Sequence, residues 1–248
     1  MFEWVASNRS ILFTKLSTDF VDNYYQVAKR LFIHYTTTQF IFTGVQVPHL
    51  IEAAGWPSIL LVVASVVGLA VIFERLWALR YSRVLPRGLL GEVLTQVREQ
   101  GISPQLVEQL DAGSPLGRIF SAGLRNERNS REAMKEAIEE AGRAVLLDLE
   151  RSLSTLGTIA SISPLLGLFG TVVGMILLFG SQSPGGGSPE ALAQGISVAL
   201  YNTAFGLVVA VPSMIFYRLF RARIDRMIVE MEQQAVKLVE VLHGDRQP

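Results

Sequence analysis

The sequence contains no cysteine, which excludes disulfides, thiolate catalysis and cysteine-based zinc or iron–sulfur sites. Its three histidines, His34, His49 and His243, are far apart and fit no metal-ligand spacing. Charged residues make up 18% of the chain, below the roughly 25% of soluble domains, and the formal net charge is zero. The composition therefore gives no indication of nucleic-acid binding. Within and near the long apolar runs of the chain, no acidic cluster or nucleophile–base pair indicates an enzyme, and no cofactor is expected.

Long apolar runs are what the chain does contain. Three of them, at 57–80, 156–180 and 192–217, reach or approach the length of about 20 residues that a helix needs to cross a bilayer. The first run has 17 uncharged residues before Glu74, which is expected to form an interfacial ion pair with Arg75. The sequence therefore predicts an all-α polytopic membrane protein with three transmembrane helices.

Basic residues predict the orientation of these spans. Ten lysines and arginines lie in the loop 81–155 and six in the segment 218–248, whereas the hairpin 181–191 has none. Loops rich in lysine and arginine stay in the cytoplasm. We expect the segment 1–56 and the hairpin outside, in the periplasm, and the loop and C-terminus inside. The sequence suggests no function for residues 1–50.

The second and third spans are expected to continue as long cytoplasmic helices. From Asn129 the chain has no strong break before Pro164, which predicts one helix of about 50 residues reaching Gly180. The segment after the third span carries one apolar stripe at helical spacing: Ile224, Met227, Ile228, Met231, Ala235, Leu238 and Leu242. Such extensions could pack only on each other, but packing on neighbouring subunits as well is favoured.

Small residues interrupt both of these spans at spacings of three and four. In lipid, van der Waals packing stabilises contacts between helices, and small residues allow the helices to approach closely. The two stripes therefore predict a tight interface, either between the two spans or between subunits. The predicted packing residues are Gly167, Gly170 and Gly174 on the second span and Ala199, Gly206 and Ala210 on the third.

Two threonines lie at matching depth in these spans. Thr171 and Thr203 are both roughly 14–16 Å from the outer ends of their helices, near the middle of a ~30 Å hydrocarbon core. A membrane threonine often bonds its own helix carbonyl, but the matched depth favours a shared polar lining that includes Asn202 and Tyr201. Neither span contains an Asp, Glu, Lys, Arg or His. A proton path here would need a carboxylate from a second protein.

The run "SPLLGLFGTVVGMI", a short hairpin and "GISVALYNTAFGLVVAVPSMIFYR" resemble the ExbB/TolQ/MotA family of proton-channel stator subunits, most closely ExbB. The resemblance covers the second and third spans closely and the "FERLWALR" end of the first more loosely. It implies a ring of five subunits in the bacterial inner membrane around two copies of a single-span ExbD- or TolR-like partner. That partner supplies a membrane Asp, and the family's pore threonines fall on Thr171 and Thr203.

The same resemblance implies that the motor energises TonB-type transport across the outer membrane, with a TonB- or TolA-like protein as a further partner. The translocated ion is expected to be a proton, with sodium as the alternative, because sodium-driven relatives also surround the partner's Asp with hydroxyls. The alternatives are a TolQ- or MotA-like stator for another envelope or motility process, and a non-conducting scaffold. One position departs from the family pattern. Val198 stands where ExbB and TolQ relatives carry a glutamate, so any role of that glutamate is in doubt.

Overall fold

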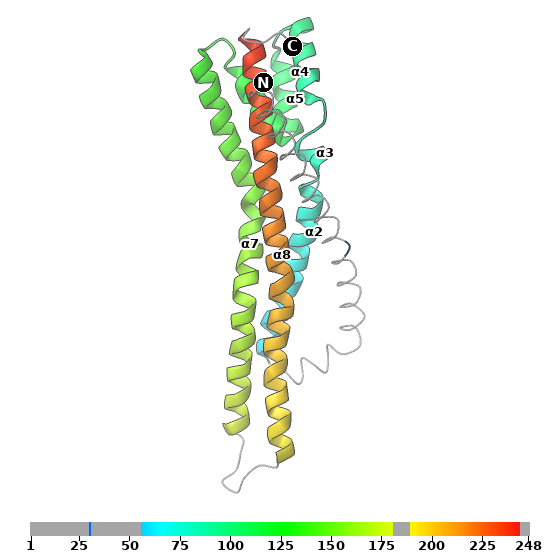
Figure 1. The fold of residues 1–248 in the computed structure, drawn as a ribbon, viewed down its shortest axis with the longest axis vertical. Coiled ribbons are helices and arrows are strands. Elements are labelled where there is room, and N and C mark those ends of the chain that lie inside the picture. The colour runs from blue at the N-terminus through cyan, green and yellow to red at the C-terminus, as the bar shows by residue number, and fades with distance from the viewer. Residues whose placement is uncertain (1–29, 31–55, 181–188, 244–248) are drawn as a thin grey trace, which may run out of the picture. The chain divides into compact units, whose positions relative to one another are not determined.

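The computed structural model describes Arg30 and residues 56–180 and 189–243, and this part of the chain is helical with no strand. Most of the predicted N-terminal segment 1–56 and of the hairpin 181–191 lies outside the described residues. The helices, in chain order, are α2 (Pro57–Ala78), α3 (Tyr81–Val84), α4 (Leu89–Gln100), α5 (Pro104–Gly113), α6 (Pro115–Arg125), α7 (Arg131–Gly180) and α8 (Pro189–Leu242) (Figure 1).

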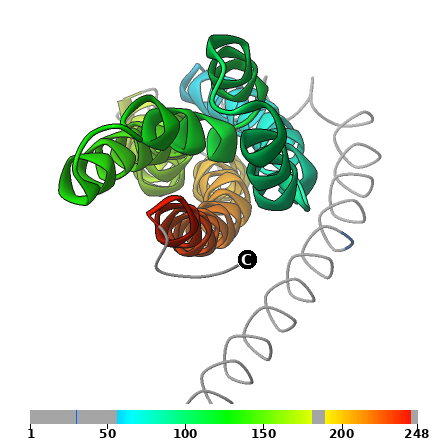
Figure 2. The ribbon, with the colours of Figure 1, turned by 90° about the horizontal axis from the view of Figure 1, so that it is seen from above.

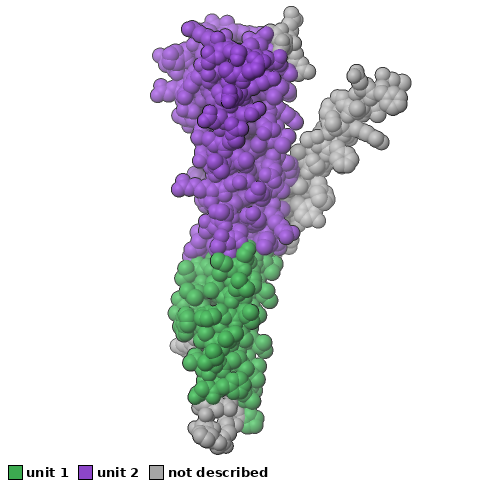
Figure 3. Space-filling model, turned by 90° about the vertical axis from the view of Figure 1, so that its left-hand side faces the viewer, with its two compact units in different colours: residues 1–65, 160–212 green, residues 66–159, 213–248 purple. Residues whose placement is uncertain are grey.

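Three of the described helices are long and apolar enough to cross a membrane, as the sequence predicts. They are α2, α7 and the part of α8 from Gly195 to Leu242. The expectation of one helix of about 50 residues is confirmed, because α7 has 50. Contacts divide the chain into two compact units (Figure 3). Unit 1 comprises residues 1–65 and 160–212, and unit 2 comprises 66–159 and 213–248.

In unit 1, α7 and α8 run side by side in opposite directions (Figures 1 and 2). Gly167 faces Gly206, and eleven residues further along α7 the side chain of Leu178 packs against Gly195. The ring of Trp56 meets that of Phe169 edge to face, with centroids 5.8 Å apart, which brings the start of α2 against α7. The outer faces of both long helices expose large apolar side chains, among them Leu165, Val172, Ile176, Leu200 and Val211. Such faces suit an apolar environment.

Unit 2 has a core of fully buried side chains around α6. Ser114 caps this helix by accepting a hydrogen bond from the backbone N–H of Gly117, and Pro115 occupies its first turn. Leu116 and Phe120 of α6 are completely buried. Five residues of the predicted stripe on α8 are also buried within this chain: Ile224, Met227, Met231, Ala235 and Leu238.

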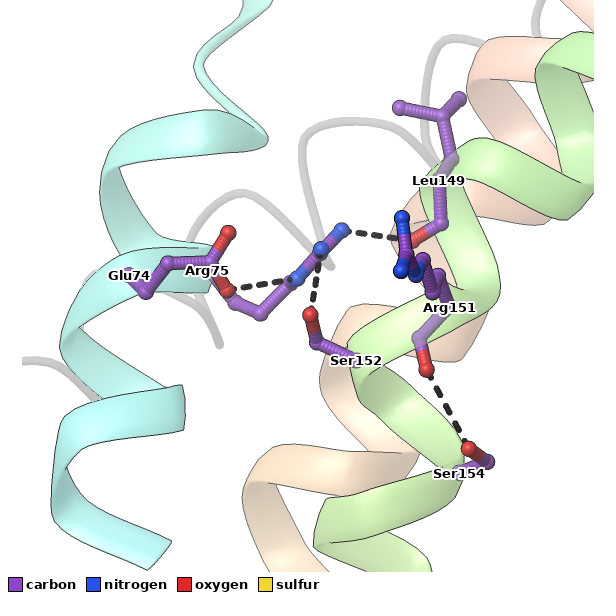
Figure 4. Close-up of polar contacts among 6 residues, drawn as sticks. All are labelled: Glu74, Arg75, Leu149, Arg151, Ser152 and Ser154. Atoms are coloured by element: carbon purple, nitrogen blue, oxygen red, sulfur yellow. Dashed lines mark hydrogen bonds and ion pairs between the residues drawn. The ribbon is translucent and has the colours of Figure 1, made fainter. Parts of the chain in front are cut away.

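A buried arginine joins α2 to α7 within unit 2 (Figure 4). The guanidinium of Arg75 donates to the carbonyl of Leu149 and to the hydroxyl of Ser152, each at 2.7 Å. Its Nε lies 2.9 Å from a carboxylate oxygen of Glu74, so the expected ion pair is confirmed. Arg75 is 7% exposed. These three bonds compensate the cost of burying the charge and fix α2 against the neighbouring helix.

Two glycines of unit 2 provide a matched test of the packing of α5 against α6. A Cβ at Gly117 would collide with the carbonyl oxygen of Leu110, whereas a Cβ at Gly142 of α7 meets nothing within 4 Å. Gly117→Ala should therefore destabilise the protein by about 1–3 kcal/mol, because α5 and α6 must move apart. Gly142→Ala should stabilise it by about 0.5–1 kcal/mol, since alanine favours a helix interior. Apparent melting temperatures of the purified variants in detergent measure both, and equal shifts would contradict the packing.

Candidate functional site

The two long helices of unit 1 touch backbone to backbone at one level. A Cβ built on Gly167 would lie 2.7 Å from the carbonyl oxygen of Asn202 and 3.2 Å from the Cα of Gly206. A Cβ built on Gly206 would lie 2.6 Å from the carbonyl oxygen of Ser163. Any residue other than glycine would force the helices apart at either position. Both glycines are buried, as is Ser163.

Further along the seam between α7 and α8, the contacts change from backbone to side chain. Gly170 leaves space for the side chain of Asn202, whose Cγ would be 2.8 Å from an added Cβ. Asn202 is 1% exposed and thus buried in this space. At Gly174 the contact is ordinary, because an added Cβ would lie 3.7 Å from the Cβ of Ala199. Of the predicted packing glycines, Gly174 is therefore the one with room for a methyl group.

The two threonines predicted to share a depth are hydrogen-bonded across the seam. The oxygens of the Thr171 and Thr203 hydroxyls lie 2.6 Å apart. The Thr171 hydroxyl also lies within donating distance of two carbonyl oxygens, 3.0 Å from that of Ala199 on α8 and 3.2 Å from that of Gly167 on its own helix. The intrahelical bond and the cross-helix bond, which the sequence offers as alternatives, are both present.

Each hydroxyl has one proton to donate, so the pair has two possible directions. In the first, Thr203 donates to Thr171, which donates to the Ala199 carbonyl. In the second, Thr171 donates to Thr203, and the Thr203 proton is free for an acceptor outside the seam. Both side chains are partly exposed, so either can reach such an acceptor. The pair can therefore reverse direction through rotation of two hydroxyls, without moving either helix.

Of the remaining residues predicted for the site or its packing, Asn202 and Ala210 are buried and Tyr201 is exposed. Asn202 faces Gly167 and Gly170 inside the seam, and Ala210 is buried at 5% exposure. Tyr201 is 53% exposed, and among the described residues it makes no hydrogen bond or ring contact. The structure thus does not join Tyr201 to the threonine pair. The side chain of Val198 lies outside the described residues.

Sequence reasoning raised the own-helix carbonyl, here that of Gly167, as an acceptor for Thr171, but it missed the carbonyl of Ala199 on the facing helix, since backbone groups leave no residue-type signal. It assigned both residues to packing. The one available signal is spacing, because Gly167 precedes Thr171 by four residues and Ala199 precedes Thr203 by four. That spacing places each carbonyl at the level of the threonine hydroxyl. Within the described residues, no group of three or more His, Asp or Glu side chains could hold a metal ion.

Comparison with known proteins places this chain in a family. Residues 111–233 match the model of the MotA/TolQ/ExbB proton channel family. An ExbB-like biopolymer transport protein of Synechocystis is 32% identical over 187 residues, which cover 73% of this chain and 88% of that protein. The chain belongs to the MotA/TolQ/ExbB proton channel family.

Two further relatives carry the names of different branches of the family. A biopolymer transport ExbB homologue of Methanothermobacter thermautotrophicus is 31% identical over 182 residues, 73% of this chain and 65% of that protein. The Tol-Pal system protein TolQ of Pseudomonas aeruginosa is 31% identical over 195 residues, 74% of this chain and 84% of that protein. The chain thus matches just under two thirds of the length of the first of these relatives. The matched family region contains the whole of the seam described above.

The glycine contacts predict graded effects of single methyl groups. Gly167→Ala and Gly206→Ala should each destabilise the protein by about 1–3 kcal/mol, because the added carbon meets backbone atoms that cannot move aside. Gly174→Ala should be neutral or slightly stabilising, since its methyl group meets Ala199 at an ordinary distance. Apparent melting temperatures in one detergent measure the series. A Gly206→Ala variant as stable as Gly174→Ala would contradict the close approach.

Proposed function

We propose that this chain is an inner-membrane proton-channel and motor subunit that energises TonB-type transport across an outer membrane. The observation that carries the proposal is the pair Thr171–Thr203, shared by two spans that have no Asp, Glu, Lys, Arg or His of their own. A charged group at the centre of a bilayer is costly, so proton relays there use ionisable side chains in protected positions. In this chain the two spans provide the hydroxyls of Thr171 and Thr203, but they contain no Asp, Glu, Lys, Arg or His. The arrangement suits a subunit that receives a carboxylate from a partner.

The partner is a single-span ExbD- or TolR-like protein with an aspartate in its membrane helix. Its carboxylate, when charged, needs hydrogen-bond donors, and when protonated it can itself donate. The hydroxyl pair can form a hydrogen bond with the charged carboxylate and with the protonated carboxyl group. Donation from Thr171 to Thr203 and on to the carboxylate stabilises the charged form. When the carboxyl is protonated, the pair reverses and donates inward to the carbonyl of Ala199, and the partner is released to move.

Several copies of this chain surround the partner, five by analogy with the family, so that successive hydroxyl pairs meet the aspartate in turn. The exposed apolar faces of α7 and α8 are then covered by lipid, by neighbouring copies and by the partner helix. The N-terminus and the hairpin lie in the periplasm and the C-terminal part of α8 in the cytoplasm, as the distribution of basic residues predicts. The ExbB-named relatives favour TonB-type transport. The TolQ relative makes a Tol-type envelope process the second candidate.

Removal of either hydroxyl should strongly reduce transport without preventing assembly. Thr171→Val and Thr203→Val keep the side-chain volume and delete one donor, and a hydrogen bond to a charged group contributes about 1.5–3 kcal/mol. We therefore expect proton flux to fall by about ten-fold or more in each variant. Thr203→Ser, which keeps the hydroxyl, should retain most of the flux. The measurement is proton flux into liposomes that contain the chain together with its single-span partner.

Thr158→Val is the matched control for these variants. Thr158 lies on the same helix, α7, and its exposed hydroxyl donates to the carbonyl of Ser154 at 2.9 Å within that helix. Its replacement should leave the flux unchanged. Unchanged flux in Thr171→Val and Thr203→Val would assign these threonines to helix packing. A well-assembled wild-type complex that conducts no protons, even when the TonB- or TolA-like protein is added to it, would instead favour the scaffold alternative.

A further inference from the structure

The end of α2 presents an apolar stripe that runs into a group of arginines. Val66, Phe73 and Trp77 lie on one face of the helix, at spacings of seven and four residues, and are more than half exposed. Trp77 is the last large side chain on this face before the helix ends at Ala78. Arg80 and Arg83 follow at once, and both are exposed. The chain thus changes within one helical turn from an apolar surface to a cationic one.

The guanidinium group of Arg83 lies over the ring of Trp77. The carbon at the centre of its guanidinium group lies 3.5 Å from the centroid of the Trp77 ring. This contact is a cation–π interaction, which uses the flat face of the guanidinium and leaves its in-plane N–H groups free to donate. The guanidinium therefore lies at the point where the apolar stripe ends. A planar guanidinium with free N–H groups is well suited to a phosphate.

No carboxylate of the described residues neutralises this pair of arginines. The acidic groups on neighbouring segments have other contacts, since Glu74 pairs with Arg75 and Glu230 accepts the hydrogen bond of the Tyr81 hydroxyl. Four other arginines of unit 2 do have acidic partners, namely Arg118, Arg125, Arg143 and Arg221. In the described part of the chain, Arg80 and Arg83 form no ion pair. Their charge is thus available to an external anion.

We propose that Arg80 and Arg83, together with Trp77, form a binding site for the headgroup of an anionic phospholipid. The lipid phosphate accepts hydrogen bonds from both guanidinium groups. Its acyl chains lie along the stripe of Val66, Phe73 and Trp77, whose exposed apolar surface matches their chemistry. Tryptophan is typical of the level at which lipid headgroups meet acyl chains. The site would hold α2, which Arg75 fixes to α7, at a defined depth in the bilayer.

The test uses the purified full-length chain in a neutral detergent, titrated with phosphatidylglycerol or with phosphatidylcholine. Apparent melting temperature is the readout, and each variant is compared with its own lipid-free value, so that loss of stability is separated from loss of binding. Phosphatidylglycerol should raise the melting temperature of the wild type in a saturable manner. Each basic residue near an anionic lipid contributes about 1 kcal/mol, so Arg80→Gln and Arg83→Gln should each weaken the apparent affinity about five-fold.

The matched control is the double variant Arg98→Gln/Arg143→Gln. It removes the same charge from exposed positions on α4 and α7. It should bind phosphatidylglycerol like the wild type, while Arg80→Gln/Arg83→Gln should bind about 25-fold more weakly. Arg83→Lys, which keeps the charge but not the flat stacking group, should bind less tightly than the wild type and more tightly than Arg83→Gln.

Three results would overturn the proposal. Equal stabilisation by phosphatidylcholine would mean that the headgroup charge is not recognised. An equal loss of affinity in the control double variant would mean that net charge alone attracts the lipid. Equal protection by inorganic phosphate at matched concentration would show that the apolar stripe contributes nothing, and the occupant would then be a free anion.

Discussion

The contact between α7 and α8 at Gly167 and Gly206 is the constraint on which the candidate site depends. Two backbones meet there with no side chain between them, and this approach lets one helix reach the other's polar groups. The Thr171 hydroxyl can then bond both to Thr203 and to the Ala199 carbonyl. A hydrogen bond weakens as its donor and acceptor atoms separate beyond the normal range of about 2.5–3.2 Å. A methyl group added at Gly167 or Gly206 would therefore increase the distance between the two helices and weaken the hydrogen bond between Thr171 and Thr203.

The seam combines buried polar groups with a complete lack of ionisable ones. Asn202 and Ser163 are almost fully buried between the helices, where lipid offers no hydrogen bonds. These groups give the pairing of the helices a defined register, because a shift by one residue would move Asn202 away from the space at Gly170. The hydroxyl pair, in contrast, is partly exposed and can reverse its direction. The register is fixed while the hydrogen-bond direction is not, and this combination suits a channel that serves a moving partner.

Much of this arrangement could be predicted from the sequence, because lipid restricts the possible structures. Apolar length identifies the three spans, and the spacing of small residues identifies the face on which Gly167, Gly206 and Ala199 lie. Matching depth brings Thr171 and Thr203 together. The pattern could not decide whether the seam lies within one chain, and it placed Tyr201 with the threonines although its side chain is exposed. Residue spacing gives the face of a helix, but the rotation of one helix against its neighbour depends on tertiary contacts such as Asn202 with Gly170.

The most direct test of the central claim is a disulfide across the seam. The chain has no native cysteine, and the Cβ positions of Gly174 and Ala199 are 3.7 Å apart, within the range that a disulfide spans. Oxidation of the Gly174→Cys/Ala199→Cys variant in membranes should give an internal disulfide, seen by mass spectrometry in a single chain, and neither single variant should form it. A disulfide that joins two chains, or free thiols after oxidation, would contradict a seam formed by α7 and α8 of one subunit.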